Sequence, residues 1–452
     1  MPEYIAPTPT ATTKGTLKNN MEKVTVIGAG LAGCEAALQL SRRGIGVILR
    51  EMKPQKFSPA HKSENFAELV CSNSLKAMRL ESAAGLLKEE MRRLCSVVME
   101  AAEETSVAAG GALAVDRELF SKYITDKVRS DPNIEVVTGE VADLPESGAV
   151  VVATGPLTSD ALAESLRRRF GGTLSFFDAV APIVTADSLD WDKVFMGARY
   201  DRGDADYVNC PMEREEYDAF YDALVLAERA PLHEFDVADP KVYEGCMPVE
   251  IMASRGRDTL RFGPLRPVGL SDPRTGRRPW ANVQLRRENA AGTMYNLVGF
   301  QTNLKFGEQK RVFSMIPGLE NAEFVRYGVM HRDTFMDSPR LLGKDLSLKA
   351  EPRLFFAGQL TGVEGYTESA ATGILAGINA ARYILGEAPL LLPETTMLGA
   401  LVNYITDGSV SDFQPMGANM GILPPLEKKI RHKDERYAAL AQRAVSALEA
   451  IL

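Results

Sequence analysis

Hydrophobic positions near the start of the chain follow the order strand, helix, strand. Residues 24–27 form a short, apolar and β-branched run, which predicts a buried parallel strand. Apolar side chains then recur with helical spacing over residues 34–43, and Gly44 marks the end of that helix. Residues 47–51 predict a second strand that ends in an acidic residue. The pattern therefore predicts a complete β-α-β unit.

Further runs of hydrophobic positions continue this alternation of helices and strands. Residues 86–104 carry apolar side chains roughly on one side of a long predicted helix, and residues 115–120 open another helix. A strand pair is predicted at residues 134–141. Residues 149–153 predict a buried strand that runs into a turn of small residues ending at Gly155.

The middle of the chain has a different pattern from its two ends. After Phe177 glycines and prolines become more frequent, and short mixed segments at residues 259–262 and 294–298 predict strands of an antiparallel sheet. The first pattern returns at residues 353–357, a predicted strand that is followed by a glycine-rich loop and by an Ala/Gly-rich helix at 369–385.

These patterns predict an α/β fold in which a large domain is interrupted by a smaller one. We expect residues 21–180 and 325–452 to form the large, discontinuous domain. Residues 181–324 are predicted to form a mixed α+β insertion domain. Residues 1–20 are rich in Thr, Pro and Ala and have neither an apolar core nor a cleavage-site pattern, which predicts a disordered leader.

The turn after the first predicted strand is suited to binding a dinucleotide. Gly28 allows the tight turn, Gly30 allows the backbone to approach a pyrophosphate, and Gly33 allows the helix to pack closely on the strand. Ala29 lies between the first two glycines. The helix N-terminus faces the phosphates, and Glu51 can accept hydrogen bonds from ribose hydroxyls.

A second set of small residues is predicted to contact the same cofactor from the other side. An Ala-Thr-Gly turn such as the one ending at Gly155 lies against the cofactor in flavoproteins of the glutathione-reductase type. The predicted contacts of the C-terminal strand–loop–helix unit are Gly358, Gln359, Gly362 and Gly365. Two contact regions favour FAD over NAD, and the large domain is therefore predicted to be an FAD-binding Rossmann-like domain of glutathione-reductase type.

Composition excludes several classes of protein. The 452 residues are 45% hydrophobic and 25% charged, which is average for a globular protein, and no apolar run is long enough for a membrane span. Five cysteines without a C-x-x-C pair favour reduced thiols and a cytoplasmic location. Four dispersed histidines without nearby cysteine pairs predict no metal site.

Charge is distributed unevenly along the chain. The formal net charge is −8, but residues 251–311 contain twelve basic and four acidic residues, so this stretch carries 12 − 4 = +8. A local positive zone of this kind attracts a polyanion such as RNA, and Arg274, Arg277 and Arg278 are the predicted contacts. The alternative is a solvated basic face with internal ion pairs.

The cysteines differ in their sequence settings. Cys71 has Asn73 and Lys76 nearby, a polar setting that would stabilise a thiolate. Cys34 and Cys95 lie in predicted helices, where a cysteine usually serves as a small core hydrophobe. Cys210 precedes a proline, and its sequence setting predicts no role.

Five segments resemble the signatures of one family, the folate- and FAD-dependent tRNA (uracil-5-)-methyltransferases. The segments are residues 71–76 (CSNSLK), 244–250 (EGCMPVE), 258–264 (DTLRFGP), 299–305 (GFQTNLK) and 358–366 (GQLTGVEGY). The resemblance covers roughly residues 21–440. Asp333 stands where the family pattern has Asn, a departure that would alter one hydrogen bond.

The resemblance implies C5-methylation of one uridine in the T-arm of tRNA. Its implied cofactors are FAD, 5,10-methylenetetrahydrofolate as carbon donor and NAD(P)H as reductant, with no obligatory protein partner. Uracil C5 is a poor nucleophile until a thiolate adds at C6, and a base must later remove the C5 proton. Cys71 and Cys246 would share these roles, with Cys71 slightly favoured as the nucleophile, and Tyr366 would lie at the flavin edge.

Four alternatives remain open at the level of sequence. A paralogue could methylate a ribosomal RNA uridine with the same chemistry. A related flavoprotein that helps to install aminomethyl groups on wobble uridine shares the loop at 358–366, but it is longer and works with a GTPase. An NAD(P)H flavin reductase, or a flavin-binding scaffold without catalysis, would explain the cofactor motifs but neither the cysteine settings nor the basic stretch.

Overall fold

The computed structural model describes most of the chain in eight segments. These are residues 23–171, 174–179, 181–201, 205–230, 247–289, 291–328, 330–410 and 413–452. The predicted leader at 1–20 and the predicted catalytic Cys246 lie outside the described residues. Within those segments, none of the helices has the length and apolar character needed to cross a membrane.

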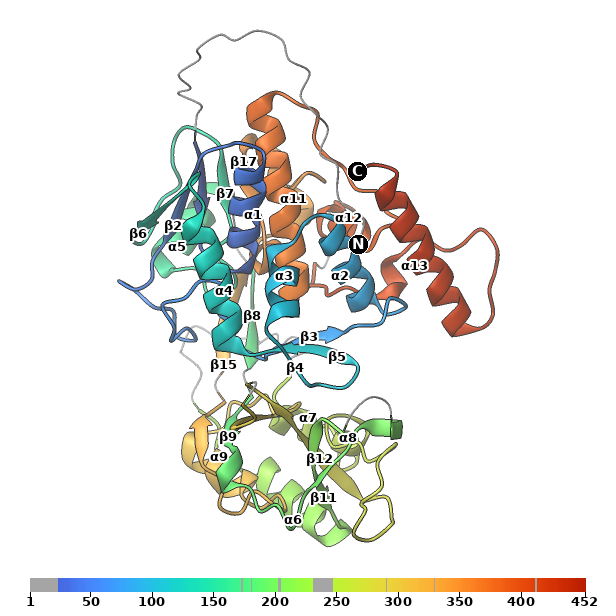
Figure 1. The fold of residues 1–452 in the computed structure, drawn as a ribbon. Helices are drawn as coiled ribbons and strands as arrows, with labels where there is room; N and C mark the ends of the chain where they lie inside the picture. Colours follow the sequence, from blue (N-terminus) through green and yellow to red (C-terminus); the bar gives the residue numbers. More distant parts are fainter. Residues whose placement is uncertain are drawn as a thin grey trace.

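A six-stranded sheet lies on the left side of the upper lobe in Figure 1. Its strand order is β16-β17-β7-β1-β2-β6, and every neighbouring pair is parallel except β16 with β17. The strands are β1 (Val24–Ile27), β2 (Val47–Glu51), β6 (Ile134–Thr138), β7 (Val150–Val152), β16 (Ser347–Leu348) and β17 (Glu351–Phe356). This parallel sheet and its covering helices confirm the predicted α/β fold.

Two helices lie side by side on this sheet because glycines let their backbones approach. The helices are α1 (Leu31–Arg42) and α11 (Tyr366–Leu385). A Cβ on Gly373 would lie 2.2 Å from the carbonyl oxygen of Ala32, and one on Gly377 would lie 2.7 Å from Cα of Ala36. No larger residue fits at either position, so this pair of contacts fixes how the N-terminal and C-terminal parts of the chain meet.

A second, antiparallel sheet forms the lower lobe of Figure 1. Its order is β10-β11-β12-β13-β9-β14. The strands are β9 (Ile183–Thr185), β10 (Phe195–Met196), β11 (Tyr207–Met212), β12 (Ala281–Arg287), β13 (Met294–Leu297) and β14 (Phe324–Arg326). Helices α6 (Arg214–Val225), α7 (Val249–Ser254), α8 (Thr259–Phe262) and α9 (Phe306–Phe313) complete this lobe.

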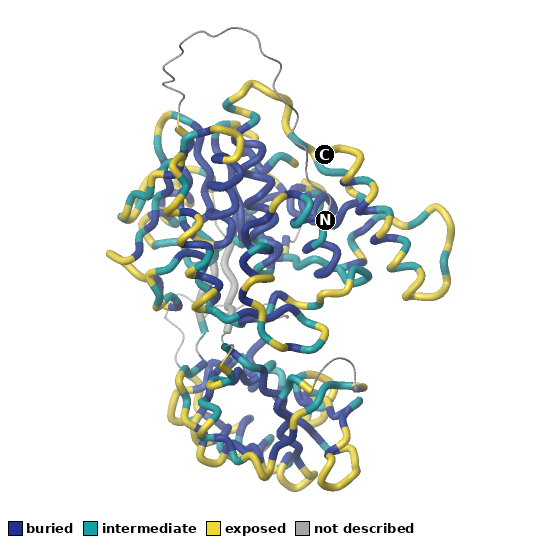
Figure 2. The backbone as a smooth tube through the Cα atoms, viewed as in Figure 1, coloured by how far each residue is buried: buried dark blue, intermediate teal, exposed yellow. Residues whose placement is uncertain are grey.

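Each lobe has its own buried core, as the dark blue tube of Figure 2 shows. Between the lobes runs an antiparallel pair, β8 (Leu174–Ala179) with β15 (Met330–Phe335). The remaining strands are β3 (Ser74–Ala77), β4 (Ser106–Val107) and β5 (Ala112–Val115). The remaining helices are α2 (Ala83–Arg93), α3 (Val97–Glu104), α4 (Arg117–Ser130), α5 (Asp160–Phe170), α10 (Ser338–Leu341), α12 (Met397–Thr406) and α13 (Lys433–Glu449).

Three element predictions were wrong. The long helix predicted at 86–104 is two helices, because Cys95 adopts a left-handed φ of 59° and Ser96 caps the N-terminus of α3. The strand pair predicted at 134–141 is the single strand β6. Residues 259–262, predicted to be a strand, form the short helix α8, whose single buried residue is Leu260.

Candidate cofactor and active site

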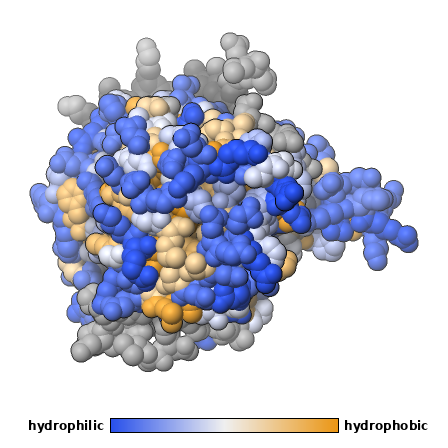
Figure 3. Space-filling view, turned by 90° about the horizontal axis from the view of Figure 1, so that it is seen from below, coloured by the Kyte–Doolittle hydropathy of each residue, from blue (hydrophilic) through white to orange (hydrophobic). Residues whose placement is uncertain are grey.

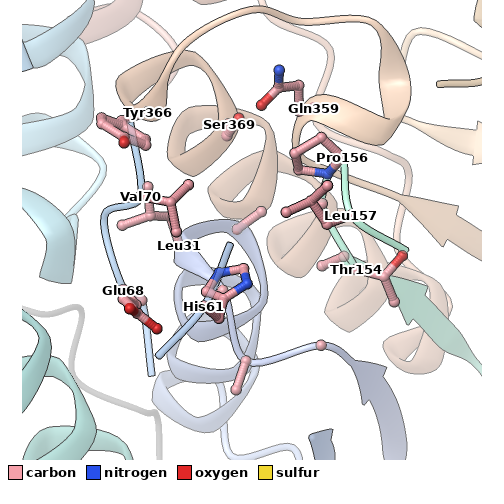
Figure 4. A pocket seen from close by; sticks show the side chains of 18 of the residues that line it. Leu31, His61, Glu68, Val70, Thr154, Pro156, Leu157, Gln359, Tyr366 and Ser369 are labelled. Carbon is pink, nitrogen blue, oxygen red and sulfur yellow. The ribbon is translucent and has the colours of Figure 1, made fainter. Parts of the chain in front are cut away.

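A cavity opens at the carboxyl ends of the parallel strands, where α/β sheets bind their ligands. Its walls come from the loops that follow β1, β2, β7 and β17, and from the segment around Cys71. The space between its walls, which opens to solvent, is about 1030 Å³. In Figure 4, Val70 and Tyr366 lie on one side of this space and Thr154, Pro156 and Leu157 on the other.

The three glycines of the first turn have separate physical roles. A Cβ on Gly28 (φ 96°) would lie 2.6 Å from the carbonyl oxygen of Ala153, and a Cβ on Gly33 would lie 1.8 Å from the carbonyl oxygen of Gly28. These two residues hold α1 against β1 and β7. A Cβ on Gly30 would meet none of the described atoms within 4 Å, and Gly30 lines the cavity. The open space at Gly30 suits a pyrophosphate.

Glu51 fixes the shape of this turn from the end of β2. One oxygen of its buried carboxylate accepts a hydrogen bond from the Ala29 amide at 2.8 Å, and the other accepts one from the Lys53 amide at 3.0 Å. A carboxylate has about four acceptor positions, so capacity remains for a ribose hydroxyl. In an adjoining hollow, the buried Nε of Arg50 has no partner among the described residues. This donor and the open turn fit a bound dinucleotide.

Only some of the residues predicted to contact the cofactor from the second glycine-rich loop line the cavity. Gly358 and Gln359 line it, as does Gly155. Gly362 and Gly365 do not: a Cβ on Gly362 would lie 2.4 Å from Cζ of Phe413, and one on Gly365 would lie 2.2 Å from Oε2 of Glu368. Both have positive φ and serve local packing. The N-terminus of the long helix α11 begins beside the cavity at Tyr366.

Cys71 and Tyr366, although 295 residues apart in sequence, meet at the cavity. Both residues line it, and the Tyr366 hydroxyl accepts hydrogen bonds from the amides of Cys71 at 2.7 Å and of Ser72 at 3.1 Å. Burial raises the pKa of Tyr366 far above its usual value, so the hydroxyl stays protonated. The structure thus places the predicted thiol beside the predicted cofactor turn.

Asn73 and Lys76, the residues expected to support a Cys71 thiolate, both engage other partners. Asn73 is fully buried, and its amide nitrogen donates to the carbonyl oxygens of Val115 and Arg287. Lys76 pairs with the buried Glu368 at 2.8 Å. Among the described residues, Arg117 is one of the cations that reach this segment, and its guanidinium donates to the carbonyl oxygens of Leu69 and Val70. The sequence lacks a signal for this contact because it depends on tertiary packing.

His61 also lines the cavity and was missed by the sequence analysis. Its Nδ1 lies 2.5 Å from the Ser58 hydroxyl. Burial lowers the pKa of His61 to about 4, and Lys53 adds to this effect. The imidazole is therefore neutral near pH 7. Its setting among polar residues after β2 is a weak sequence signal for a position at the cavity.

The other described cysteines lie away from the cavity wall. Cys34 and Cys210 are buried, and burial raises the pKa of each thiol, so both remain protonated core residues. Cys95 was predicted to be a core residue, which was wrong because the helix breaks at this position and leaves the residue exposed. All four described cysteines are free thiols.

Much of the basic stretch is engaged in ion pairs. Arg274, Arg277 and Arg278 are all exposed, but Arg274 pairs with Asp272 at 2.8 Å and also donates to the carbonyl oxygen of Asp192. Further ion pairs in this stretch involve Arg257, Arg261, Lys305 and Arg311. Figure 3 shows the lower face of the molecule, which is largely hydrophilic with an apolar patch near its centre.

Sequence comparison identifies close relatives over nearly the whole chain. The profile of the family described as glucose inhibited division protein A matches residues 23–388. A methylenetetrahydrofolate--tRNA-(uracil-5-)-methyltransferase TrmFO of Geobacter sulfurreducens is 60% identical, over 94% of this chain and 98% of that protein. The protein of the same name from Ligilactobacillus salivarius is 58% identical, over 94% of this chain and 97% of that protein.

Structural comparison supports the fold. A crystal structure of Aquifex aeolicus GidA (form II) superposes with a TM-score of 0.68 and 17% identity, covering 96% of this chain and 74% of that chain. A second crystal form of the same protein gives a TM-score of 0.66 over 95% of this chain and 76% of that chain.

Proposed function

Because the chain belongs to the glucose inhibited division protein A family, and within it to the methylenetetrahydrofolate--tRNA-(uracil-5-)-methyltransferases, we propose that its cavity methylates C5 of a uridine in the T-arm of tRNA. The protein is a tRNA uracil-5-methyltransferase, with FAD as its cofactor and methylenetetrahydrofolate as its carbon donor. We further propose that NAD(P)H reduces the flavin and that the protein works in the cytoplasm without an obligatory protein partner.

The cavity residues divide into those that hold FAD and those that face the reacting atoms. Gly28, Ala29 and Gly30 would hold the pyrophosphate at the N-terminus of α1, and Glu51 would hold the ribose. Gly358 would contact the flavin side of the cofactor. Bound FAD supplies the two-electron reduction that turns a transferred methylene carbon into a methyl group.

Thiol chemistry makes uracil C5 nucleophilic. A thiolate adds to C6, the C5–C6 double bond becomes an enolate, and C5 can then attack the methylene carbon, whose bond to a folate nitrogen breaks. A base removes the C5 proton afterwards, and loss of the thiolate from C6 restores the double bond. We propose that Cys71 and Cys246 divide these two roles. We favour Cys71 as the nucleophile because it lines the cavity and is only partly buried.

Tyr366 is proposed to position Cys71 rather than to transfer a proton. Its hydroxyl accepts hydrogen bonds from two amides of the Cys71 segment, and its high pKa opposes use as a base near pH 7. Its ring lines the cavity and can contact the flavin edge.

The parts of the chain are proposed to have separate roles. Residues 21–180 and 325–452 would form the FAD-binding domain, and residues 181–324 would form the insertion domain that faces RNA. The exposed Arg277 and Arg278 support an RNA-facing role better than Arg274 does, because Arg274 is already paired with Asp272.

A single observation carries the proposed function: Cys71 lies in the wall of the cavity that the dinucleotide-binding turn also lines. A thiol in this wall suits covalent addition to a pyrimidine ring held beside the cofactor. The test is to incubate the protein with a tRNA transcript, labelled methylenetetrahydrofolate and NADPH, and to search the digested RNA for 5-methyluridine. A ribosomal RNA transcript serves as the competing substrate.

Cys71→Ala and Cys246→Ala should each lose methylation while retaining FAD. A tRNA that contains 5-fluorouridine traps the adduct, because its C5 has no proton to release. The variant that cannot form the adduct identifies the nucleophile, and an adduct formed by Cys71→Ala would overturn the preference for Cys71.

A further inference from the structure

The segment at residues 69–73, which carries Cys71, is held from three directions by side chains of distant elements. Tyr366, at the start of α11, accepts hydrogen bonds from the amides of Cys71 and Ser72. Arg117, at the start of α4, donates to the carbonyl oxygens of Leu69 and Val70 at 2.8 and 3.2 Å. These two residues belong to the same lobe as Cys71.

The third direction comes from the other lobe. Arg286 lies on β12 of the antiparallel sheet and is 7% exposed. Its Nε donates to Oδ1 of Asn73 at 2.9 Å, and its Nη2 donates to the Ser72 hydroxyl at 2.6 Å. The planar guanidinium therefore holds two consecutive side chains directly after the thiol.

A second residue just after β12 acts on the same segment through Arg117. The Glu288 carboxylate, 3% exposed, forms a two-point ion pair with Arg117, with distances of 2.7 Å to Nε and 3.3 Å to Nη2. This pairing leaves Nη1 of Arg117 to hold the carbonyl oxygens of Leu69 and Val70. Burial would lower the pKa of Arg117, but Glu288 raises it, so the guanidinium remains charged.

These contacts form a continuous connection from the antiparallel sheet to the thiol. We propose that Arg286 and Glu288 are positioning residues that seat Cys71 in the cavity wall and make its alignment depend on the placement of the antiparallel sheet. This inference rests on the proposed role of Cys71 in methylation. Binding of RNA to the lower lobe would then act on the thiol through β12.

The energetics favour a positioning role over simple stabilisation. Burying charged groups costs free energy that apolar packing avoids, and the hydrogen-bond partners of Arg286 are neutral side chains. Burial accordingly lowers the pKa of Arg286. Arg117, Arg286 and Glu288 instead fix the position and direction of a short segment of backbone. Such control matters because misplacing a reacting group by about 1 Å can lower the rate on the order of 100-fold.

The test compares Arg286→Gln and Arg286→Lys with Arg287→Gln as the matched control. Arg287 neighbours Arg286 on the same strand, and its hydrogen bond to the Cys71 segment comes from its backbone carbonyl oxygen, which the substitution keeps. We expect Arg286→Gln to keep its FAD and its tRNA affinity within about twofold while kcat falls by about 10–100-fold. Arg286→Lys should restore part of kcat, and Arg287→Gln should match the parent.

The rate at which Cys71 is alkylated tests the inference independently of turnover. Alkylation of Cys71 by iodoacetamide, read by mass spectrometry of its peptide, should become several-fold faster in Arg286→Gln, because the released segment exposes the thiol. It should keep the parental rate in Arg287→Gln. Unchanged kcat and unchanged alkylation in Arg286→Gln would overturn the inference.

Two milder variants cover the case in which Arg286→Gln does not fold. Ser72→Ala removes the 2.6 Å hydrogen bond without moving a charge, and Glu288→Gln keeps the shape of its side chain but loses the ion pair. Each should lower kcat more than it raises KM for tRNA. Parental kcat in both variants would overturn the inference. Methylation by Cys71→Ala would instead overturn the proposed role of Cys71 on which the inference rests.

Discussion

At the scale of single residues, the glycines of the cofactor turn serve two different purposes. Two of them allow close packing of the backbone, and the third leaves space for the ligand. Gly28 and Gly33 are in backbone contact with other parts of the chain, and a Cβ on Gly33 would overlap the carbonyl oxygen of Gly28. Gly30 faces open space at the cavity, where a side chain would occupy the position of the ligand. Three glycines in one motif therefore have different sensitivities to substitution.

This difference gives a testable contrast. Gly30→Leu should purify as a folded but colourless protein, because its side chain blocks the pyrophosphate, and its free energy of unfolding in the absence of FAD should change by about 1 kcal/mol at most. Gly33→Ala should lower the stability of the apoprotein much more, because its Cβ has no room. Flavin absorbance and thermal unfolding measure the two effects. A Gly30→Leu protein as yellow as the parent would contradict the assignment of this turn.

At the scale of secondary-structure elements, two helices begin at buried carboxylates. Glu90 of α2 accepts hydrogen bonds from the amides of Met397 and Leu398 at 2.6 and 2.8 Å, at the N-terminus of α12. Glu35 of α1 accepts from the amide of Val98 at 3.0 Å, at the N-terminus of α3. Burial raises the pKa of each carboxyl to about 7, although the helix amides oppose this shift.

These shifts predict a pH dependence of stability. The Glu90 carboxyl has a pKa of about 7 in the folded chain and about 4.5 in the unfolded chain. Between these two pH values the folded chain binds more protons than the unfolded chain. The free energy of unfolding therefore decreases as the pH rises from about 4.5 to 7. Glu90→Gln removes this titration. The midpoint of thermal unfolding should therefore fall less in the variant than in the parent between pH 5 and pH 7.5. Parallel pH profiles of the two proteins would show that Glu90 keeps an ordinary pKa.

At the scale of the whole molecule, the charge excess in residues 251–311 is smaller at the surface than in the sequence. Arg286 turns inward to the Cys71 segment, and Arg274 is held by Asp272. Arg277 and Arg278 remain on the exposed turn that precedes β12. Only charges that are not already paired release counterions when RNA binds, so the exposed pair should contribute most to salt-dependent affinity.

Arg277 and Arg278 should therefore matter more for tRNA binding than Arg274. Replacing both by Gln should raise the dissociation constant for tRNA and reduce the slope of log affinity against log salt by roughly 1 for each phosphate that is no longer neutralised. Arg274→Gln is the comparison, and it should change the slope little. Oxidation of the reduced flavin by oxygen should be unchanged in all variants. Equal slopes in the parent and the double variant would identify the basic stretch as a solvated face.

Local sequence determined the elements of the cofactor site because each depends on residues close together in the chain. Hydrophobic runs predicted β1, α1 and β2 within a few residues, and glycine spacing predicted the turn between them. Small residues also predicted the strand–turn units ending at Gly155 and Gly358, both of which reach the cavity. Steric limits on backbone conformation act between neighbouring residues, so a short stretch of sequence is enough to predict their effect.

Only the tertiary structure decided which side chains surround Cys71. The sequence favoured Asn73 and Lys76 because they are near in the chain, but the folded protein pairs Lys76 with Glu368 and brings Arg117 and Arg286 to the thiol segment. Ion pairs and hydrogen bonds form between groups that packing brings within about 3 Å, whatever their separation in sequence. Patterning along the chain could therefore predict the cofactor-binding turn and single out Cys71, but not the arginines that contact the Cys71 segment.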